Sequence, residues 1–104
     1  MNWKSKENTS FIKAILSLET NNEAERFLRD LMTEKEIKEF ANRLKAAEML
    51  THNIHYTTIE EETGLSSTTV ARVSKWLKGK EGGYRTVINK LHHHKTVQLR
   101  RGLS

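Results

Sequence analysis

The chain has 104 residues, 36% hydrophobic and 30% charged, so it forms one small domain whose thin core a second subunit would complete. It has no cysteine, which excludes disulfide bonds and thiolate metal sites and fits a reducing cytosol. Its net charge of +5 is the sum of −3 from residues 1–65 (9 basic, 12 acidic) and +8 from residues 66–104 (9 basic, 1 acidic). A basic half of this kind indicates a polyanionic partner. The alternative is a solvated basic tail.

The apolar residues recur at helical spacing along most of the chain, and proline is absent. We predict an all-α fold with six helices, near residues 8–18, 22–31, 34–51, 57–63, 66–78 and 83–94. Three helix starts fit the capping box, in which a hydroxyl and a carboxylate satisfy the free amides of the first turn: Thr20 with Glu23, Thr33 with Glu36, and Thr57 with Glu60. The last ten residues lack an apolar pattern, so residues 96–104 are predicted to be a flexible basic tail.

No apolar run approaches the roughly 20 residues that span a bilayer, and MNWKSKENTS lacks the apolar core of a signal peptide. We therefore expect a cytoplasmic protein with no membrane partner.

Residues 57–77 have the pattern of a helix-turn-helix. Gly64 suits the end of the first helix, because a left-handed backbone costs glycine little, and the Ser66 hydroxyl is placed to cap the second helix. In that second helix Val70, Val73 and Leu77 share one face, with Ile59 placed to pack against them. Only polar and basic side chains occupy the opposite face, which carries Thr68, Arg72 and Lys75.

The second helix of such a pair enters the major groove of DNA by its N-terminal end. Short hydroxyl side chains allow close approach to bases, Arg72 suits guanine or a phosphate, and Lys75 and Lys78 suit phosphates. The predicted DNA-binding residues are Thr57, Thr58, Ser66, Ser67, Thr68, Thr69, Arg72, Lys75 and Lys78. The alternative is an amphipathic helix whose charged face is merely solvated.

Other kinds of site find little support. His92, His93 and His94 are adjacent, so on a helix they diverge, whereas ligands on one helix need i, i+4 spacing. We expect no metal site. No pair of carboxylates has an acid–base setting, and GKEGGYR lacks phosphate-loop spacing, so we expect no enzyme activity.

The chain resembles the tryptophan-repressor-like family, and most closely its YerC/YecD-type branch, from about Phe11 to Leu91. The resemblance rests on FLRDLMTEKEIKEFANRL (27–44), on the stretch from Tyr56 to Leu77, and on GGYR (82–85). It implies an intertwined, all-helical homodimer. In one domain of residues 1–95, residues 1–55 would mainly serve dimerisation, 56–78 would form the helix-turn-helix, and 83–94 the C-terminal helix.

In the tryptophan repressor two arginines hold the effector L-tryptophan, and the resemblance carries those positions onto Arg43 and Arg72, with Leu31 and Thr33 upstream. The family's glycine and small serine near the ligand are replaced here by Val73 and Trp76. The indole of Trp76 would then fill the space of a ligand. We therefore expect no cofactor and no control by free tryptophan or another small effector, and Arg43 is expected to pair with an acid.

Together these features predict a transcriptional regulator that binds double-stranded DNA in a sequence-specific manner. The resemblance implies a homodimeric repressor on a palindromic operator. The alternative is a helical, dimeric protein-interaction module without specific DNA binding.

Overall fold

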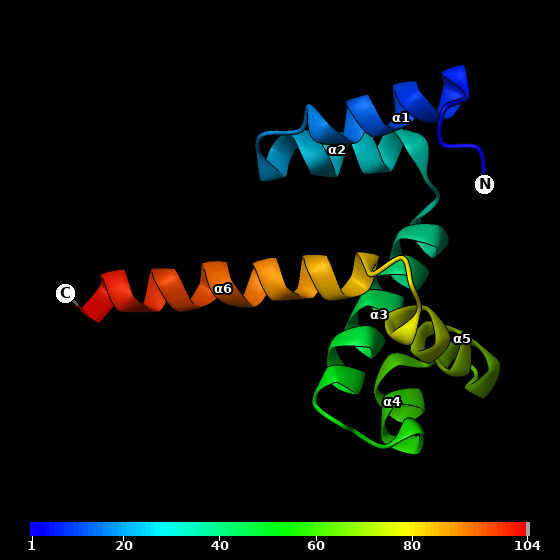
Figure 1. Cartoon of the computed structure of the whole chain (residues 1–104), viewed down its shortest axis with the longest axis vertical. Helices are drawn as coiled ribbons and strands as arrows, with labels where there is room; N and C mark the ends of the chain where they lie inside the picture. Colours follow the sequence, from blue (N-terminus) through cyan, green and yellow to red (C-terminus); the bar gives the residue numbers. More distant parts are fainter. Residues whose placement is uncertain (104) are drawn as a thin grey trace. The chain divides into compact units, whose positions relative to one another are not determined.

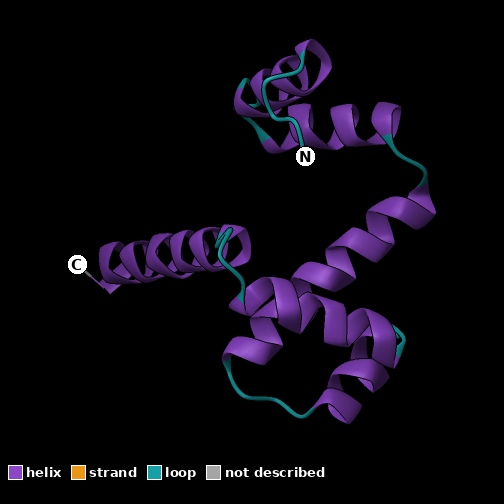
Figure 2. Cartoon of the chain, turned by 45° about the vertical axis from the view of Figure 1, so that its right-hand side comes forward, coloured by secondary structure: helices purple, strands orange, loops and turns teal. Residues whose placement is uncertain are grey.

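The computed structural model describes the backbone of residues 1–103 and the side chains of residues 1–93. In that part of the chain all regular structure is α-helical (Figure 2), which confirms the predicted class. Six helices follow one another (Figure 1): α1 Lys6–Leu16, α2 Asn21–Leu31, α3 Glu34–Thr51, α4 Tyr56–Thr63, α5 Ser67–Lys78 and α6 Gly83–Leu103. Among the described residues, no helix is both long and apolar enough to cross a bilayer. The chain divides into two compact units, residues 1–37 and 38–104.

Two of the three predicted capping boxes hold helix starts. At α2 the amide of Glu23 donates to the Thr20 hydroxyl at 3.1 Å, but the Glu23 carboxylate accepts from the Glu19 amide at 2.9 Å and not from the Thr20 amide, so only the hydroxyl half of the box is formed. Thr33 and Glu36 form the full reciprocal pair: the Glu36 amide donates to the Thr33 hydroxyl at 3.1 Å, and the Thr33 amide donates to the Glu36 carboxylate at 2.9 Å. Hydrogen bonding of the Glu36 carboxylate to Thr33, first to its amide and then to its hydroxyl, lowers the pKa of Glu36 below its ordinary value.

The third predicted box, Thr57 with Glu60, is wrong. Helix α4 begins at Tyr56, and His55 takes the capping position with extended backbone (φ −65°, ψ 145°) and no side-chain hydrogen bond. Thr57 therefore lies within the first turn, two residues after the capping position, where its hydroxyl does not cap the helix. The helix starts early because α3 ends in a tight reversal at Asn53, whose φ is +59°.

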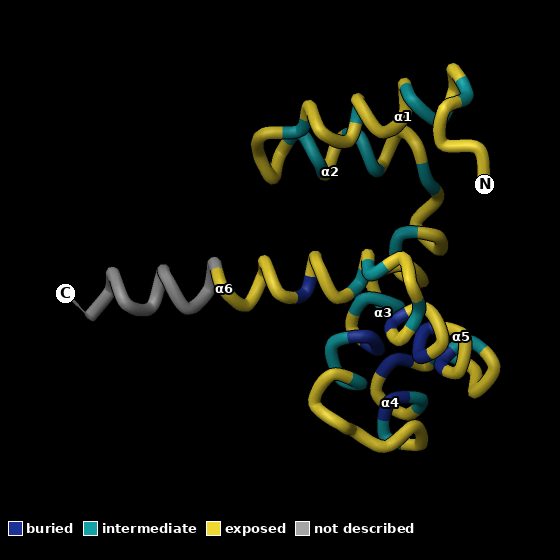
Figure 3. The backbone as a smooth tube through the Cα atoms, viewed as in Figure 1, coloured by how far each residue is buried: buried dark blue, intermediate teal, exposed yellow. Residues whose placement is uncertain are grey.

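Helices α1 and α2 of the first unit lie side by side (Figures 1 and 2) but bury no residue between them. The apolar stripe of α1 is uncovered, with Phe11 42% and Leu16 77% exposed. Figure 3 shows the two helices without any fully buried position. A single copy of the chain thus leaves this unit without a closed core.

The second unit has a compact core (Figure 3). Its buried apolar residues come from α3, α4, α5 and α6: Ala46, Ala47, Ile59, Val70, Val73, Leu77 and Ile88. The predicted inner face of α5 and its packing partner Ile59 are confirmed. Each fully buried Ile or Val of this set contributes about 2 kcal/mol of hydrophobic stabilisation.

Helix α6 extends to Leu103, beyond its predicted end at residue 94, so the predicted end is wrong. The backbone of 96–103 continues as helix because no proline interrupts it and its next glycine is Gly102, whereas an apolar stripe is not needed for helical geometry. Side chains from His94 on, and Ser104 altogether, lie outside the described residues.

Candidate nucleic-acid interface

Helices α4 and α5 pack against each other and are joined by a turn at Gly64, in agreement with the predicted helix-turn-helix. Gly64 is left-handed (φ +72°), and its amide donates to the Glu60 carbonyl at 2.9 Å. A methyl group added there would meet no atom within 4 Å, so the backbone angle alone explains the glycine. The Thr63 hydroxyl donates to the Ile59 carbonyl and accepts from the Leu65 amide, which fixes the entry into the turn.

Ser66 caps α5, as predicted. Its hydroxyl accepts from the Thr69 amide at 3.2 Å and donates to the Thr69 hydroxyl at 3.0 Å. The hydroxyls of Ser66 and Thr69 are thus already bonded to each other. Ser67 and Thr68 are exposed, and within the described residues their hydroxyls have no hydrogen-bond partner, so these two remain open to a ligand.

Apart from Ala71 and Trp76, the exposed side chains of α5 are polar or basic. Arg72, Lys75 and Lys78 are exposed, and none of them forms an ion pair or a hydrogen bond in the part of the chain that the structure describes. We call Ser67, Thr68, Arg72 and Lys75 the α5 ridge. Of the other predicted contacts, Thr57 is exposed, and Thr58 and Thr69 are half-buried.

The electrostatics of α5 favour an anion. The helix carries three basic side chains and no acidic one. Its N-terminal amides add partial positive charge, which attracts phosphate. A surface of free guanidinium, ammonium and hydroxyl groups at a helix start is suited to a nucleic-acid backbone and to base edges.

Comparison with known proteins agrees with this geometry. A family model described as Trp repressor protein matches residues 6–92. The chain belongs to the Trp repressor family. The uncharacterized protein YerC of Bacillus subtilis (strain 168) is 36% identical over 93 residues, 89% of each chain, which places this chain in the YerC-type branch.

Two crystal structures of Trp repressor family members are also similar. A TrpR-like protein from Eubacterium eligens ATCC 27750 has 35% identity and a TM-score of 0.81, with 86% of this chain and 93% of that one covered. A candidate Trp repressor from Staphylococcus aureus has 30% identity and a TM-score of 0.82, with 88% and 95% covered. At the family level, this chain is a DNA-binding regulator, of a family that is typically non-enzymatic.

The residues that match the family's effector site fall into both units of the chain. Leu31 and Thr33 belong to the first unit, and Arg43, Arg72 and Trp76 to the second. Arg43 pairs with an acid, as expected: its Nη2 lies 3.7 Å from the carboxylate of Glu39, one helical turn away.

Arg43 also lies over the ring of Phe40, with the guanidinium carbon 5.3 Å from the ring centre. Its Nε is buried without a hydrogen bond within the described residues. Val73 is buried in the core, whereas Trp76 is 53% exposed. Within this single chain, therefore, the Trp76 indole does not lie in a closed cavity.

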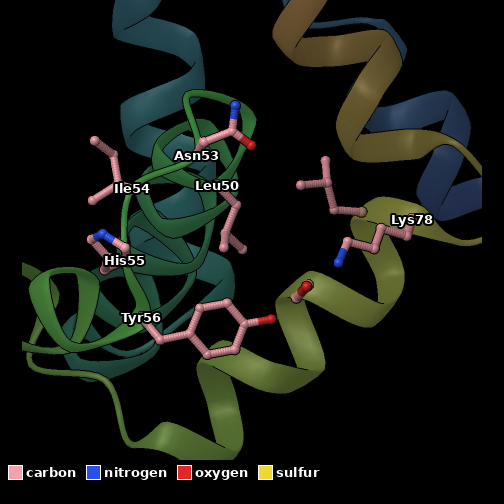
Figure 4. A pocket seen from close by; sticks show the side chains of 8 residues that line it. Leu50, Asn53, Ile54, His55, Tyr56 and Lys78 are labelled. Carbon is pink, nitrogen blue, oxygen red and sulfur yellow. The ribbon is translucent and has the colours of Figure 1, made fainter.

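A groove on the other side of α5 was not predicted from the sequence. It has a volume of about 470 Å³ and lies between the α3–α4 loop, the start of α4 and the C-terminal half of α5 (Figure 4). Its walls include Leu50, Asn53, Tyr56, Ser74, Leu77 and Lys78. These residues come from three separate stretches with no common motif, so no signal in the sequence joins them.

The histidines give no metal cluster among the described residues. The rings of His52 and His92 stack with centroids 5.8 Å apart, which joins the α3–α4 loop to α6. The side chain of His94 lies outside the described residues, so the predicted lack of a metal site stays a prediction.

Proposed function

We propose that this chain is a sequence-specific transcriptional regulator, a repressor that binds a palindromic operator in the cytoplasm as a homodimer. The observation that carries the proposal is the α5 ridge, whose Arg72 and Lys75 have no partner within the described part of the chain. On the opposite side of the helix, Val70, Val73 and Leu77 are buried in the core. A helix held so firmly by its inner face presents the ridge to the major groove as a rigid surface.

The uncovered apolar stripe of α1 supports the homodimer. Phe11, Ile12 and Ile15 are each more than a third exposed, on a helix with no buried residue. Large contiguous apolar surface of this kind is unfavourable in water and marks an interface. A second copy would cover it and supply a core for the first unit, so folding and association would be one process.

A two-fold dimer presents two α5 ridges. Two such ridges recognise half-sites that are one helical turn of DNA, or a multiple of it, apart, so the operator should be palindromic. Affinity should fall steeply with salt, because Lys and Arg displace counterions from phosphates.

The proposal includes no small-molecule cofactor. Trp76 stands where the family has a small serine, and we suggest that its indole, covered by the partner subunit, takes the place of a tryptophan effector. Such a protein would bind its operator without free tryptophan.

The experiment is a selection of bound fragments from random DNA, followed by anisotropy titration of the selected site. Thr68→Ala and Arg72→Ala should each weaken specific binding by about 1–3 kcal/mol, while sedimentation still shows a dimer. Lys90→Ala, an exposed lysine of α6, is the control and should bind normally. If both ridge variants bind the selected DNA as wild type does, the α5 ridge is not the contact surface and the proposal is wrong. If the selection yields no specific DNA, the chain is instead a dimeric protein-interaction module.

A further inference from the structure

The groove beside α5 combines an apolar wall with unpaired polar groups. Leu50 and Leu77 supply the apolar wall. Figure 4 shows the hydroxyl of Tyr56 and the amino group of Lys78 directed into the groove. Neither side chain has a hydrogen bond or ion pair in the described part of the chain. The volume of about 470 Å³ is within the range of small-molecule sites.

Ser74 is the most deeply buried polar side chain among those that line the groove. The residue is only 4% exposed, yet across residues 1–93 its hydroxyl has no hydrogen-bond partner. The hydroxyl oxygen itself is not sealed off, because among the described residues the sealed and unpaired side-chain atom is Nε of Arg43, so the Ser74 hydroxyl opens onto the groove. The groove that Ser74 lines is the place from which a partner would reach this hydroxyl.

The charge of the groove selects an anion. Among the described residues that line the groove, Lys78 carries a positive charge and none carries a carboxylate. Helix α4 starts at the same place, at Tyr56, and no side chain caps its first amides. Free amides at a helix start add partial positive charge. An apolar wall next to these groups excludes a fully polar anion as the best occupant.

We propose that the groove binds a small carboxylate with an apolar body. The body would contact Leu50 and Leu77, and the carboxylate would accept hydrogen bonds from Lys78, Ser74 and Tyr56. Because Lys78 is also a predicted phosphate contact, the ligand competes with DNA for its ammonium group and weakens operator binding. This second half rests on the proposed function, whereas ligand binding itself does not.

The groove is separate from the positions of the family's effector. It includes none of Leu31, Thr33, Arg43, Arg72 and Trp76. On α5, Ser74 and Lys78 lie two and six residues after Arg72, so at 100° per residue their side chains point away from it.

The test is an NMR titration of the full-length ¹⁵N-labelled protein with hexanoate, with hexan-1-ol and inorganic phosphate as comparison probes. Hexanoate should give saturable shifts at the amides around Tyr56, Ser74 and Lys78, and should bind at least tenfold more tightly than either probe. No saturable shift at these amides overturns the proposal. Equal binding of hexan-1-ol overturns the carboxylate's role, and binding of phosphate alone shows a site for the DNA backbone instead.

Single substitutions test the contributions of Lys78 and Ser74 to hexanoate binding. Lys78→Gln should weaken hexanoate binding about tenfold and Ser74→Ala about fivefold, in keeping with the loss of a charge-assisted and of a neutral hydrogen bond. Lys90→Gln, the same charge change on α6, should leave it unchanged. If Lys78→Gln and Ser74→Ala bind hexanoate as the wild type does, the proposal is wrong.

The effect of hexanoate on DNA binding is measured by anisotropy titration of the operator. Titrations in sodium hexanoate are compared with titrations in sodium chloride at the same ionic strength. Hexanoate should raise the Kd for the operator several-fold in the wild type and have no effect on Lys78→Gln. If hexanoate binds but the Kd is unchanged, the coupling is wrong and the site stands. If the protein binds hexanoate but no DNA, the proposed function fails and the site again stands.

Discussion

The guanidinium of Arg85, near the start of α6, donates a hydrogen bond to the main-chain carbonyl oxygen of Leu77, in the last turn of α5. Carbonyls at a helix end lack a partner within the helix, and a cationic donor is favourable there. Between these residues Gly82 has a left-handed backbone (φ +70°), and the guanidinium lies close above it. The segment GGYR therefore holds the end of α5 in place.

This arrangement makes a prediction about stability. Arg85→Met should lower the free energy of unfolding by about 1 kcal/mol, because the bond to Leu77 is lost without a substitute donor. Lys90→Met, on the same helix, should change it little. Urea denaturation at one fixed protein concentration measures both, and equal stabilities would mean that the Arg85 bond contributes nothing.

The two left-handed glycines allow a sharper comparison. Gly64→Ala should cost about 1 kcal/mol from the backbone alone, since no atom lies within 4 Å of the added methyl group. Gly82→Ala should cost more, because its methyl group would lie 3.0 Å from Nη2 of Arg85. The excess should vanish in the Arg85→Met background, and an additive double-mutant cycle would contradict this explanation.

The Thr33–Glu36 pair predicts a pH effect on the start of α3. The amide and then the hydroxyl of Thr33 hold the pKa of Glu36 below 4.5 in the folded chain. A lowered folded pKa means stabilisation that is present above the unfolded value and is lost as pH falls through the folded one. Carboxyl ¹³C titration should show Glu36 ionising below 4.5, and Thr33→Ala should raise that pKa only in part, because the amide remains. A pKa of 4.5 or above in the wild type would show that the box is not formed.

The sequence predicted the parts of the fold that depend on local patterns. Val70, Val73 and Leu77 recur at helical spacing, and Ser66 precedes them as a typical cap, so the inner face and the start of α5 were both predicted correctly. His55 was missed as the cap of α4 because histidine has no capping preference, whereas Thr57 and Glu60 match the box by composition. The end of α6 was missed because an absent apolar stripe was taken as a helix end.

The parts that depend on distant contacts were not predictable. The Arg85–Leu77 bond spans a turn whose path is set by Gly82, and only the folded chain brings the two groups together. The groove unites Leu50, Tyr56 and Ser74 from three elements. Their spacing in the sequence has no period and resembles no motif, so only the tertiary structure reveals that Ser74 is buried and unpaired.

The salt dependence of DNA binding tests the role of Lys75. If Lys75 contacts a phosphate in each protomer, Lys75→Gln should weaken binding equally on the operator and on random DNA. It should also reduce the slope of log K against log salt by about 2, roughly one per contact. Lys90→Gln should keep the wild-type slope. An unchanged slope in Lys75→Gln would assign that lysine to solvent rather than to phosphate.

The position of Trp76 allows a test of whether its indole replaces a tryptophan effector or whether the protein still binds L-tryptophan. If its indole replaces a free tryptophan, the wild type should bind its operator equally well with and without L-tryptophan, and calorimetry should show no micromolar binding of the amino acid. Trp76→Ser should weaken operator binding about tenfold through lost packing, and added indole should restore part of it. Trp3→Ser removes the other exposed indole and should change nothing. Saturation of the wild type by micromolar L-tryptophan would show instead that the family's effector site is intact and that Trp76 lies outside it.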